Sequence, residues 1–390
     1  MDIRQLHPEE FDASMNLSEY AFQYKLPSAK RAEAKSRFKP ERVWGAFVEG
    51  ELEAKLTLLP LQVYIQGRVV PMGGIAGVAT WPENRRQGHV AKLLTHTLET
   101  MNKAGQTLSF LHPFLIPFYR KFGFEVYCEY KKYTIPVAKF PKKTEVDGKV
   151  RRNVKEIGIL DQLYNQFAMR YNGTLKRDND WWENSVLDDE GQNAVFYSST
   201  GVPKGYILYR VENRELVIDE FVYMNEQARQ GLWTFLANHD SMVTGAKLKL
   251  VPSDDMLPFL LPDPRIEQES YPYFMGRIVN AKAFIESYSF REHSSPEKYV
   301  VYIEDQYAPW NQGLWEWSIS STGSGTLTRL EADPAEADLS CDIGTLTTVM
   351  LGYKRPTELA RYGRLTGNQA ALEWLEAIIP QAETALFDHF

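Results

Sequence analysis

The sequence predicts an α+β protein: two related domains, each built on a mixed sheet, and a smaller α/β domain after them. The chain has 390 residues, which at roughly 150 residues per domain corresponds to two or three domains. Antiparallel strand patterns come before one long helix and further strands, the order of a mixed α+β domain. A strand–loop–helix segment then occurs a second time. The expected domains are 1–145, 146–282 and 283–390.

Hydrophobic periodicity and turn signals predict the elements of the first domain. A turn at Glu49–Glu51 separates two apolar runs, because Gly50 tolerates positive φ. Apolar residues from Val90 to Met101 recur every three or four positions, the period of one buried helical face. The expected elements, in order, are helical stretches at 8–24 and 29–38, strands at 43–48, from 52, and at 61–65, 69–70 and 74–80, a helix at 90–101, a strand at 107–111, a helical stretch at 114–121 and a strand at 123–126.

The segment 140–152 is rich in Lys, Pro and Gly, so we interpret it as a linker. After it, residues 221–232 align without a gap on residues 78–89, sharing a Glu and an Arg-Gln-Gly triplet. Both segments are expected to follow a strand and to begin a helix, with a strand hairpin (195–209) before the second copy, which indicates a duplication. The third domain is expected to contain strands at 299–304 and 314–320, a segment from 341 to 351 ending at Gly352, a helix at 357–362 and a last helix that Pro380 kinks or ends.

Composition excludes several classes of protein. The net charge of −7 and a pI near 5.7 disfavour nucleic acid as a partner. Two cysteines make no disulfide framework, no Cys/His cluster has metal spacing, and no apolar stretch is long enough for a bilayer. Without an apolar signal region at the N-terminus, the expected location is the cytoplasm, with no metal and no membrane partner. Residues 331–390 contain ten Asp/Glu and four Lys/Arg, which suits either a solvated face or a cationic substrate.

Arg85-Arg86-Gln87-Gly88-His89-Val90 follows a predicted strand and begins a predicted helix. The first turn of a helix has unpaired N–H groups and a partial positive charge. Gly88 lets a phosphate approach the backbone, and Arg85 and Arg86 add charge that can bind it bidentately. The pattern favours an anion site for a pyrophosphate; the alternative is a helix start with two solvated arginines.

A second motif, Pro117-Phe118-Tyr119-Arg120-Lys121-Phe122-Gly123-Phe124, follows the next predicted strand. Its Tyr-x-x-x-Gly-Phe segment places a tyrosine near the end of that strand. The alternative is a partly buried aromatic without a chemical role.

Together these motifs resemble the GCN5-related N-acetyltransferases, which carry Arg/Gln-x-x-Gly-x-Gly/Ala after the fourth strand and Tyr-x-x-x-Gly-Phe after the fifth. Val90 departs from the usual Gly/Ala. The three-segment plan is most similar to the enhanced intracellular survival (Eis) acetyltransferases, in which a catalytic domain, a degenerate copy and a sterol-carrier-protein-like domain follow one another. That resemblance covers essentially the whole chain.

The resemblance implies acetyl-CoA as the co-substrate, bound where the fourth and fifth strands diverge. The backbone of Val78, Ala79 and Thr80 would bind the pantetheine and thioester. The amides of Gln87, Gly88, His89 and Val90, together with Arg85 and Arg86, would hold the pyrophosphate. Tyr119 would be the general acid and the terminal carboxylate of Phe390 the general base. The second copy has Ala228 where the first has Arg85, so we expect it to be structural. A hexamer is also implied.

Two further sets of residues are candidates for the acceptor side. Glu19, Tyr20, Phe22 and Tyr24 lie where an N-terminal helix would wall the acceptor pocket in this superfamily. His112, at the end of the predicted fifth strand, is a rival base to Phe390 because its ordinary pKa lies near 6.5. A histidine that only makes hydrogen bonds at a strand end is the alternative.

The function expected from these observations is N-acetylation of primary amines on polycationic, aminoglycoside-like small molecules by direct transfer from acetyl-CoA. One alternative keeps the chemistry and changes the acceptor to a lysine or N-terminal amine of a protein or peptide. The other is a protein that binds acyl-CoA or an apolar ligand without catalysis.

Overall fold

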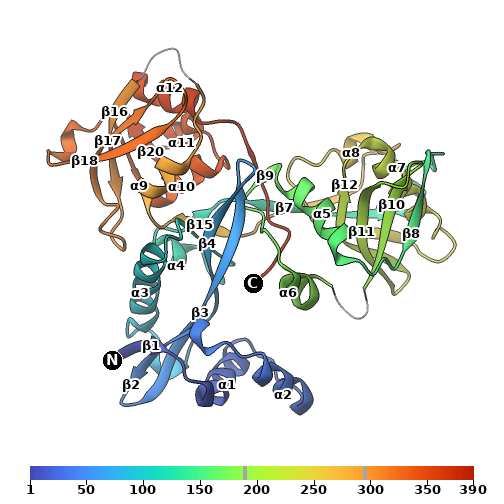
Figure 1. Cartoon of the computed structure of the whole chain (residues 1–390), viewed down its shortest axis with the longest axis horizontal. Helices are drawn as coiled ribbons and strands as arrows, with labels where there is room; N and C mark the ends of the chain where they lie inside the picture. Colours follow the sequence, from blue (N-terminus) through green and yellow to red (C-terminus); the bar gives the residue numbers. More distant parts are fainter. Residues whose placement is uncertain (188–190, 293–296) are drawn as a thin grey trace.

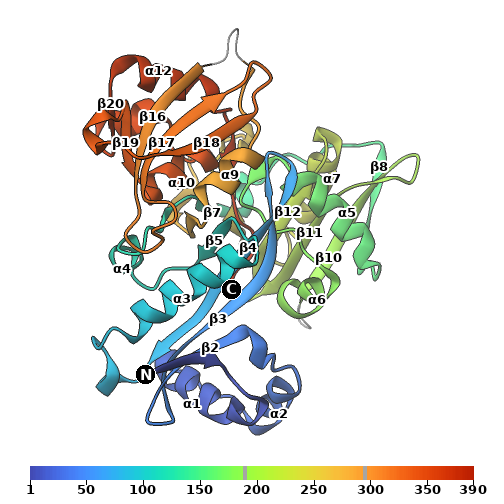
Figure 2. The same cartoon turned by 60° about the vertical axis from the view of Figure 1, so that its left-hand side comes forward.

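The computed structural model describes residues 1–187, 191–292 and 297–390, which form three lobes (Figure 1). The first lobe is built mainly from the N-terminal third of the chain, the second from the middle and the third from the C-terminal part. The last residues leave the third lobe and end between the other two, as both views show (Figures 1 and 2). Within the described residues, no helix is both long and apolar enough to cross a bilayer.

The first sheet has the strand order β1-β2-β3-β4-β5-β15-β6, and its β4 and β5 are parallel. Three of its helices pack on its faces. The strands are β1 (Asp2–Gln5), β2 (Val43–Val48), β3 (Glu51–Ile65), β4 (Arg68–Thr80), β5 (Leu108–Leu111), β6 (Glu125–Val126) and β15 (Met275–Ile278), and the helices are α1 (Phe11–Ala21), α2 (Ser28–Ser36), α3 (His89–Lys103) and α4 (Ile116–Arg120).

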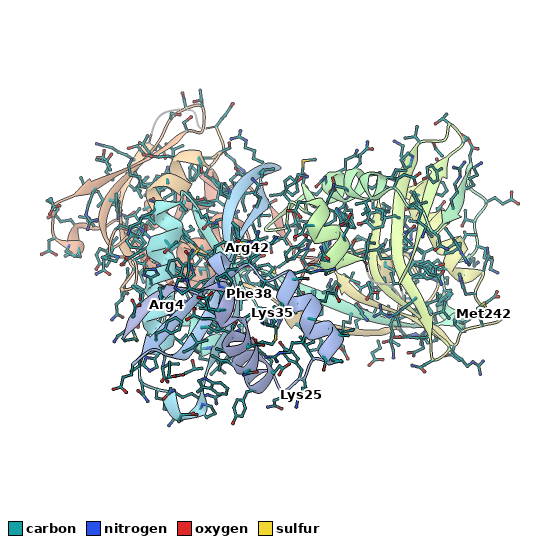
Figure 3. The ribbon with its side chains drawn as sticks, turned by 60° about the horizontal axis from the view of Figure 1, so that its bottom comes forward. Arg4, Lys25, Lys35, Phe38, Arg42 and Met242 are labelled. Carbon is teal, nitrogen blue, oxygen red and sulfur yellow. The ribbon has the colours of Figure 1, made fainter. Side chains whose placement is uncertain are left out.

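The pleat of β2 separates two faces of this sheet, because successive side chains of a strand point to opposite sides. Trp44 and Ala46 pack in the cluster that contains the apolar face of α3, whereas Val43 and Phe47 pack with Leu17 of α1. Helices α1 and α3 therefore cover opposite faces. Figure 3 brings the bottom of the molecule forward, with α1 and α2 in view, and labels Lys25 in the loop between them and Lys35 near the end of α2.

The second sheet repeats the plan of the first, in the order β14-β7-β13-β12-β11-β10-β8, with β12 and β13 parallel. Its strands are β7 (Glu129–Pro136), β8 (Gly148–Arg152), β10 (Gln192–Ser198), β11 (Pro203–Glu212), β12 (Glu215–Tyr223), β13 (Gly245–Val251) and β14 (Glu267–Pro272), and its helices are α5 (Ile157–Ala168), α6 (Asn179–Trp181), α7 (Glu226–Ala237) and α8 (Leu257–Leu260). The segment interpreted as a linker contains β8, which pairs with β10 at the sheet edge. That interpretation was wrong for residues 148–152.

The two sheets exchange strands. β7 falls within the predicted first domain but lies between β13 and β14 of the second sheet. β15 falls within the predicted second domain but lies between β5 and β6 of the first sheet. The two lobes are thereby joined through backbone hydrogen bonds, and the predicted boundary at 145 does not coincide with a boundary between sheets.

The third lobe has a five-stranded sheet, β18-β17-β16-β19-β20, with helices packed against it. Its elements are β16 (Glu297–Glu304), β17 (Gly313–Ile319), β18 (Gly325–Leu330), β19 (Leu339–Asp342), β20 (Leu365–Gly367), α9 (Ala281–Ser287), α10 (Ile343–Leu351), α11 (Pro356–Arg361) and α12 (Gln369–Ile378). Helix α12 ends two residues before Pro380, as predicted.

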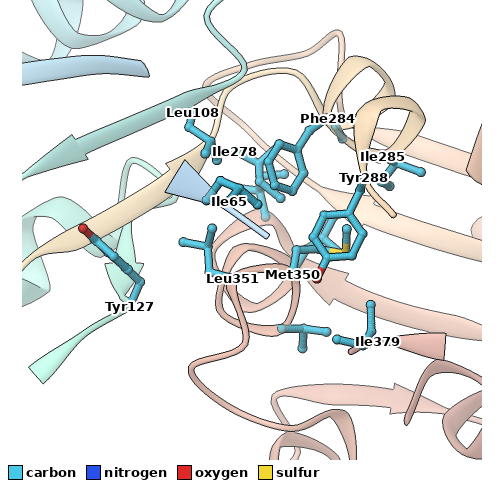
Figure 4. Packing of buried hydrophobic residues seen from close by; sticks show 14 of the residues in the cluster. Ile65, Leu108, Tyr127, Ile278, Phe284, Ile285, Tyr288, Met350, Leu351 and Ile379 are labelled. Atoms are coloured by element: carbon cyan, nitrogen blue, oxygen red, sulfur yellow. The ribbon is translucent and has the colours of Figure 1, made fainter. Parts of the chain in front are cut away.

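One hydrophobic cluster continues from the first sheet into the third lobe. Figure 4 shows Ile65 and Leu108 of the first sheet beside Phe284 and Tyr288, from α9 and the residue after it, and Met350 of α10. Buried side chains therefore pack the third lobe against the first sheet. This packing fixes the position of α12, from which the C-terminal tail leaves the third lobe.

The C-terminal tail after α12 makes one short parallel pairing, β21 (Glu383–Thr384) with β9 (Tyr171–Asn172) of the second lobe. Beyond it, Ala385, Leu386 and Asp388 are buried. The tail therefore crosses from the third lobe to the junction of the first two as an ordered segment.

Candidate active site

The parallel strands β4 and β5 diverge halfway along β4. They pair only from Met72 with Leu108 to Ile75 with Leu111, although β4 continues to Thr80. On its other edge, β4 has a bulge: Ala76 opposes Thr57 and Ala79 opposes Lys55, with Gly77 at φ 57° between them. A bulge bends a strand and leaves backbone groups unpaired. The backbone of Val78, Ala79 and Thr80 therefore borders a gap in the sheet.

The loop before α3 presents a helix N-terminus to solvent. Arg86 and Gly88 have φ values of 65° and 85°, and Gly88 is the N-cap residue, with no side chain capping the helix. A Cβ on Gly88 would meet no atom within 4 Å. Arg85, Arg86 and Gln87 are exposed, and neither arginine forms an ion pair within the parts of the chain that the structure describes.

His89 and Val90 turn inward instead. The His89 side chain is buried, with Nδ1 3.1 Å from the sulfur of Met1. Val90 packs with Val78 in the hydrophobic cluster that contains Leu93, Leu94, Leu98 and Met101 of α3, called here the α3-face cluster. From these two residues the chain offers only backbone N–H groups to the open space in front of the helix. The N-terminus of α3 thus combines a partial positive charge, unpaired backbone N–H groups and room for a ligand. Proteins commonly bind phosphates at helix N-termini with these properties.

Tyr119 lies on α4 in the same α3-face cluster. Its ring centroid is 5.2 Å from that of Phe114 and 5.1 Å from that of Phe118, and the residue is 2% exposed. Burial raises the pKa of Tyr119 well above its ordinary value. Its hydroxyl makes no hydrogen bond to any residue that the structure describes. Arg120 does not assist it, because Glu125 binds this guanidinium in a bidentate ion pair.

Phe390 reaches the opposite face of the same strand. Gly73 faces Met101 of α3, whereas its neighbour Gly74 faces Phe390, whose Cε2 would lie 2.9 Å from a Cβ placed there. The Phe390 ring also contacts Phe274, with centroids 4.8 Å apart. The last residue of the chain therefore lies against β4 one position before its pairing with β5 ends, on the face away from α3.

His112 and the tail are brought together at this point. His112 directly follows the last β5 residue, and its ring centroid is 4.7 Å from that of His389. Burial, and then the charge of His389, lower the pKa of His112, and burial lowers the pKa of His389. His112 and Phe390 each also contact the Phe274 ring, so the two residues proposed as alternative bases lie in one neighbourhood, and the structure does not choose between them.

The N-terminal candidates lie at the end of α1, on the face that also receives the tail. Tyr20, Phe22 and Tyr24 are 57%, 50% and 41% exposed, and the Tyr20 ring lies 5.4 Å from Trp81, just beyond β4. Glu19 is engaged within its own segment by Arg31, at 3.1 Å, and by the N–H of Leu26. The structure gives no contact between this set and the chain end.

The second lobe has the same strand divergence without the same groups. β12 and β13 pair only from Glu215 to Ile218. α7 begins right after Asn225, whose side chain caps the helix by accepting from the N–H of Ala228. Arg229 is bound to Glu226, and Gly231 lies inside the helix. The second copy follows a strand and begins a helix, as predicted, but its Arg-Gln-Gly triplet lies inside that helix because Asn225 starts the helix earlier.

The tyrosine is missing there too. α8 begins Leu257-Pro258-Phe259-Leu260, and α4 begins Ile116-Pro117-Phe118-Tyr119, each after the corresponding strand. Leu260 thus stands where the first lobe has Tyr119. The shared Pro-Phe pair is the sequence signal that identifies this correspondence. Within the described residues there is also no cluster of His, Cys, Asp or Glu that could hold a metal ion.

A mixed sheet whose parallel strands diverge beside an uncapped, glycine-led helix defines an acyltransferase of the GNAT type. Residues 2–127 match the model of an acetyltransferase (GNAT) domain, residues 173–278 match a second acetyltransferase (GNAT) domain, and residues 281–387 match a sterol carrier protein domain. The chain belongs to the GNAT family of N-acetyltransferases, with two such domains and a sterol-carrier-like third. This confirms the predicted resemblance and fold class.

Similar proteins span the whole chain. A probable N-acyltransferase of Enterococcus faecalis is 30% identical, with a TM-score of 0.93 over 100% of this chain and 99% of that one. Eis1 of Mycobacterium abscessus shares the fold, with a TM-score of 0.82 over 100% of both chains at 22% identity. An uncharacterised N-acetyltransferase of Streptomyces avermitilis is 23% identical, over 87% of this chain and 85% of its own. The protein is thus an enzyme, an N-acetyltransferase.

Proposed function

We propose that the first domain transfers the acetyl group of acetyl-CoA to a primary amine of a polycationic small molecule, with aminoglycoside-like compounds as the leading class. The observation that carries the proposal is the meeting of three features around one gap in the sheet. An open anion-binding helix start and a tyrosine with a free hydroxyl lie on one side. The chain terminus lies on the other.

The residues present fit acetyl-CoA. Gly88 and the N–H groups that follow it would bind the pyrophosphate, with Arg85 and Arg86 as exposed counter-charges. The backbone of Val78 to Thr80 would hydrogen-bond the pantetheine and the thioester carbonyl. When bound, acetyl-CoA supplies an activated acetyl group. The second lobe has a capped helix at the equivalent place, so we expect one acetyl-CoA per chain.

Tyr119 would protonate the departing thiolate as the amine nitrogen bonds to the acetyl carbon and the carbon–sulfur bond breaks. Ordinary pKa values of about 10 for tyrosine and about 8.5 for a thiol make this transfer uphill by roughly 2 kcal/mol. Burial raises the pKa of Tyr119 further, so the hydroxyl is protonated at neutral pH but gives up its proton less readily than these ordinary values indicate.

The base has to accept the proton that the amine loses. A terminal carboxylate titrates near 3.5 and a lysine-like ammonium near 10.4, so transfer before attack is uphill by about 9 kcal/mol. The Phe390 carboxylate would therefore orient the amine and accept the proton only after the nitrogen has attacked. His112, in ring contact with His389, is the second candidate for this step. Closely spaced polyamines, whose amine pKa values are depressed, suit such a weak base.

A cleft between the first two lobes has room for a large acceptor. It has a volume of about 790 Å³ and lies between the β3–β4 hairpin and the segment before α6, where Asp161 and Asp178 line it together with Lys176 and Arg177. Its wall includes Trp181, whose ring contacts Phe390 at 6.2 Å between centroids. Drug-sized ligands occupy pockets of this size.

Thiol release from acetyl-CoA, measured with untagged protein against several amines, tests the proposal. The panel would contain aminoglycosides, spermidine, free lysine and a lysine-rich peptide, with products identified by mass. Transfer to the polyamines and aminoglycosides supports it. Transfer to the peptide alone assigns the protein-lysine alternative, and acetyl-CoA binding without transfer to any amine contradicts the catalytic assignment for these acceptors.

A further inference from the structure

Asp388, two residues before the chain end, is held by side chains that come from outside the third lobe. Its Oδ1 accepts from Arg177 Nε at 2.9 Å and from Trp181 Nε1 at 2.8 Å, and its Oδ2 lies 3.2 Å from the Tyr164 hydroxyl, whose proton is shared with the Leu175 carbonyl at 3.0 Å. The backbone carbonyl of Asp388 accepts from the hydroxyl of Tyr273 at 2.8 Å. Four donors thus hold one residue that is 5% exposed.

The arginine in this set is itself immobilised. The Arg177 side chain is fully buried and lies between Asp388 and Glu220, with Nη1 3.2 Å from the Glu220 carboxylate. Its guanidinium carbon lies 3.7 Å from the Tyr164 ring centroid. Glu220 also accepts from the hydroxyl of Tyr206 at 2.6 Å. Burial opposes the charge of Arg177, but the two carboxylates raise its pKa well above the ordinary value. A buried charge with these partners has little freedom to move.

The network lies where the second lobe's own strands diverge. Glu220 is two residues beyond Ile218, where β12 stops pairing with β13. Next to Asp388, Phe387 lines the cavity of about 180 Å³ at this divergence, and its ring contacts Phe167 with centroids 5.6 Å apart. The second lobe lacks counterparts of the loop before α3 and of Tyr119. At its own strand divergence, where the first lobe would bind the cofactor, it holds the C-terminal tail instead.

We infer that Asp388 is a positioning residue, and that Arg177, Tyr164 and Trp181 of the second GNAT domain clamp it so that the carboxylate of Phe390 stays at the active cleft. This inference rests on the proposed function. Two residues span at most about 7 Å, so the clamp limits how far the chain end can move from Gly74 and His112. The degenerate domain thereby contributes to the chemistry without binding acetyl-CoA.

Asp388→Ala and Asp388→Asn test the clamp, with Glu376→Gln as the matched control. Glu376 is a carboxylate in the third lobe that accepts from Arg355 Nε at 2.7 Å and from Thr357, and it belongs to no part of the site. A catalytic group displaced by about 1 Å can cost about 10²-fold in rate. We therefore expect kcat to fall about 10²-fold in Asp388→Ala and less in Asp388→Asn, which keeps an acceptor oxygen. The dissociation constant of acetyl-CoA and the kcat of Glu376→Gln should not change.

A second measurement tests, independently of enzymatic activity, how firmly the C-terminal tail is held: the rate at which a protease releases Phe390. Carboxypeptidase A removes C-terminal aromatic residues, and mass spectrometry follows the release of Phe390. The clamp predicts slow release from the wild type and from Glu376→Gln, and release at least about 10-fold faster from Asp388→Ala. If that variant does not fold, Tyr164→Phe, which removes the hydroxyl beside Oδ2 and keeps the phenyl ring over Arg177, takes its place with a smaller effect in the same direction.

The outcomes separate this inference from the proposed function. Equal release rates and equal kcat in Asp388→Ala and the wild type would overturn the clamp and leave the acetyltransferase proposal standing. A wild type that transfers no acetyl group, but protects Phe390 in an Asp388-dependent way, would remove the proposed function and leave only the anchoring of the tail. Faster release with unchanged kcat would overturn the positioning role.

Discussion

The ring of Phe390 packs against Gly74 of β4, next to the last residue pair that joins β4 to β5. A Cβ at Gly74 would lie 2.9 Å from Cε2 of Phe390 and 2.8 Å from Cδ1 of Leu61. Real side chains essentially never approach so closely, so the chain end can occupy this position only because residue 74 has no side chain.

Gly74→Ala should therefore push the chain end away from β4. We expect kcat to fall about 10²-fold, while the affinity for acetyl-CoA stays the same because its loop lies at the start of α3. Steady-state kinetics and a binding titration measure the two quantities. Gly158→Ala is the control, since a Cβ at Gly158 in α5 meets nothing within 4 Å. Wild-type kcat in Gly74→Ala would show that this contact is irrelevant to turnover.

Tyr119→Phe should lower kcat by about 10²–10⁴-fold, the usual contribution of a general acid, with little change in stability. The hydroxyl makes no hydrogen bond to a described residue, so its removal breaks no contact of the free enzyme. Tyr127→Phe is the opposite case: this buried hydroxyl donates to the carbonyl of Gly173 at 3.2 Å, and its loss should cost about 1 kcal/mol of stability at unchanged kcat. If the two variants behave alike, Tyr119 is not the acid.

Replacing Arg85 and Arg86 together by Ala should weaken acetyl-CoA binding by about 10-fold or more, because each exposed guanidinium would lose a charge-assisted hydrogen bond to phosphate. The loss should shrink at high salt, which screens exposed charges. Arg229→Ala, in the second lobe, should leave binding unchanged, and titration should give one acetyl-CoA per chain. A stoichiometry of two would mean that the second domain also binds the co-substrate.

Lys55 makes part of the stability depend on pH. Its buried ammonium donates to the backbone and hydroxyl oxygens of Ser14, each at 2.7 Å, and burial lowers its pKa from 10.5 to about 8. Between these pKa values the unfolded chain binds more protons than the folded one, so stability rises with pH in this window. Relative to Lys55→Met, the wild type should gain about 2 kcal/mol from pH 7.5 to 9.5 in urea denaturation.

The exposed Lys149 provides the comparison for that experiment. Lys149→Met should show the same pH dependence as the wild type, because this side chain is exposed to solvent rather than buried. If the free energy of unfolding changes with pH in the same way in the wild type and in Lys55→Met, burial of the Lys55 ammonium does not destabilise the protein.

Local signals predict the parts of this structure that depend on neighbouring residues. The periodicity from Val90 to Met101 predicts a helix, and α3 spans His89–Lys103 with Leu93, Leu94, Leu98 and Met101 buried. The sequence places Gly88 at the start of that helix, and the structure has it there as the N-cap residue with a φ of 85°, which glycine adopts readily. The loop before α3, proposed to bind phosphate, and Tyr119 could therefore be located from the sequence.

Features that join distant parts of the chain have no such signal. Asp388 meets Arg177 across 211 positions, and neither residue stands in a motif. The exchange of β7 and β15 leaves each strand with an ordinary local pattern, so only the sheets reveal it. Helix α7 starts before its Arg-Gln-Gly triplet because a single side chain, Asn225, caps it. The alignment of the two copies does not indicate this cap.

Acetyl transfer by untagged wild type, compared with a chain shortened by Phe390 alone, tests the central claim most directly. Both proteins receive acetyl-CoA and the best amine of the panel, and acetylated product is measured by mass. We expect rapid product formation by the wild type and at least a 10²-fold loss in the shortened chain, with acetyl-CoA binding equal in both. Equal turnover in the two proteins would contradict the assignment of the chain end to the active site.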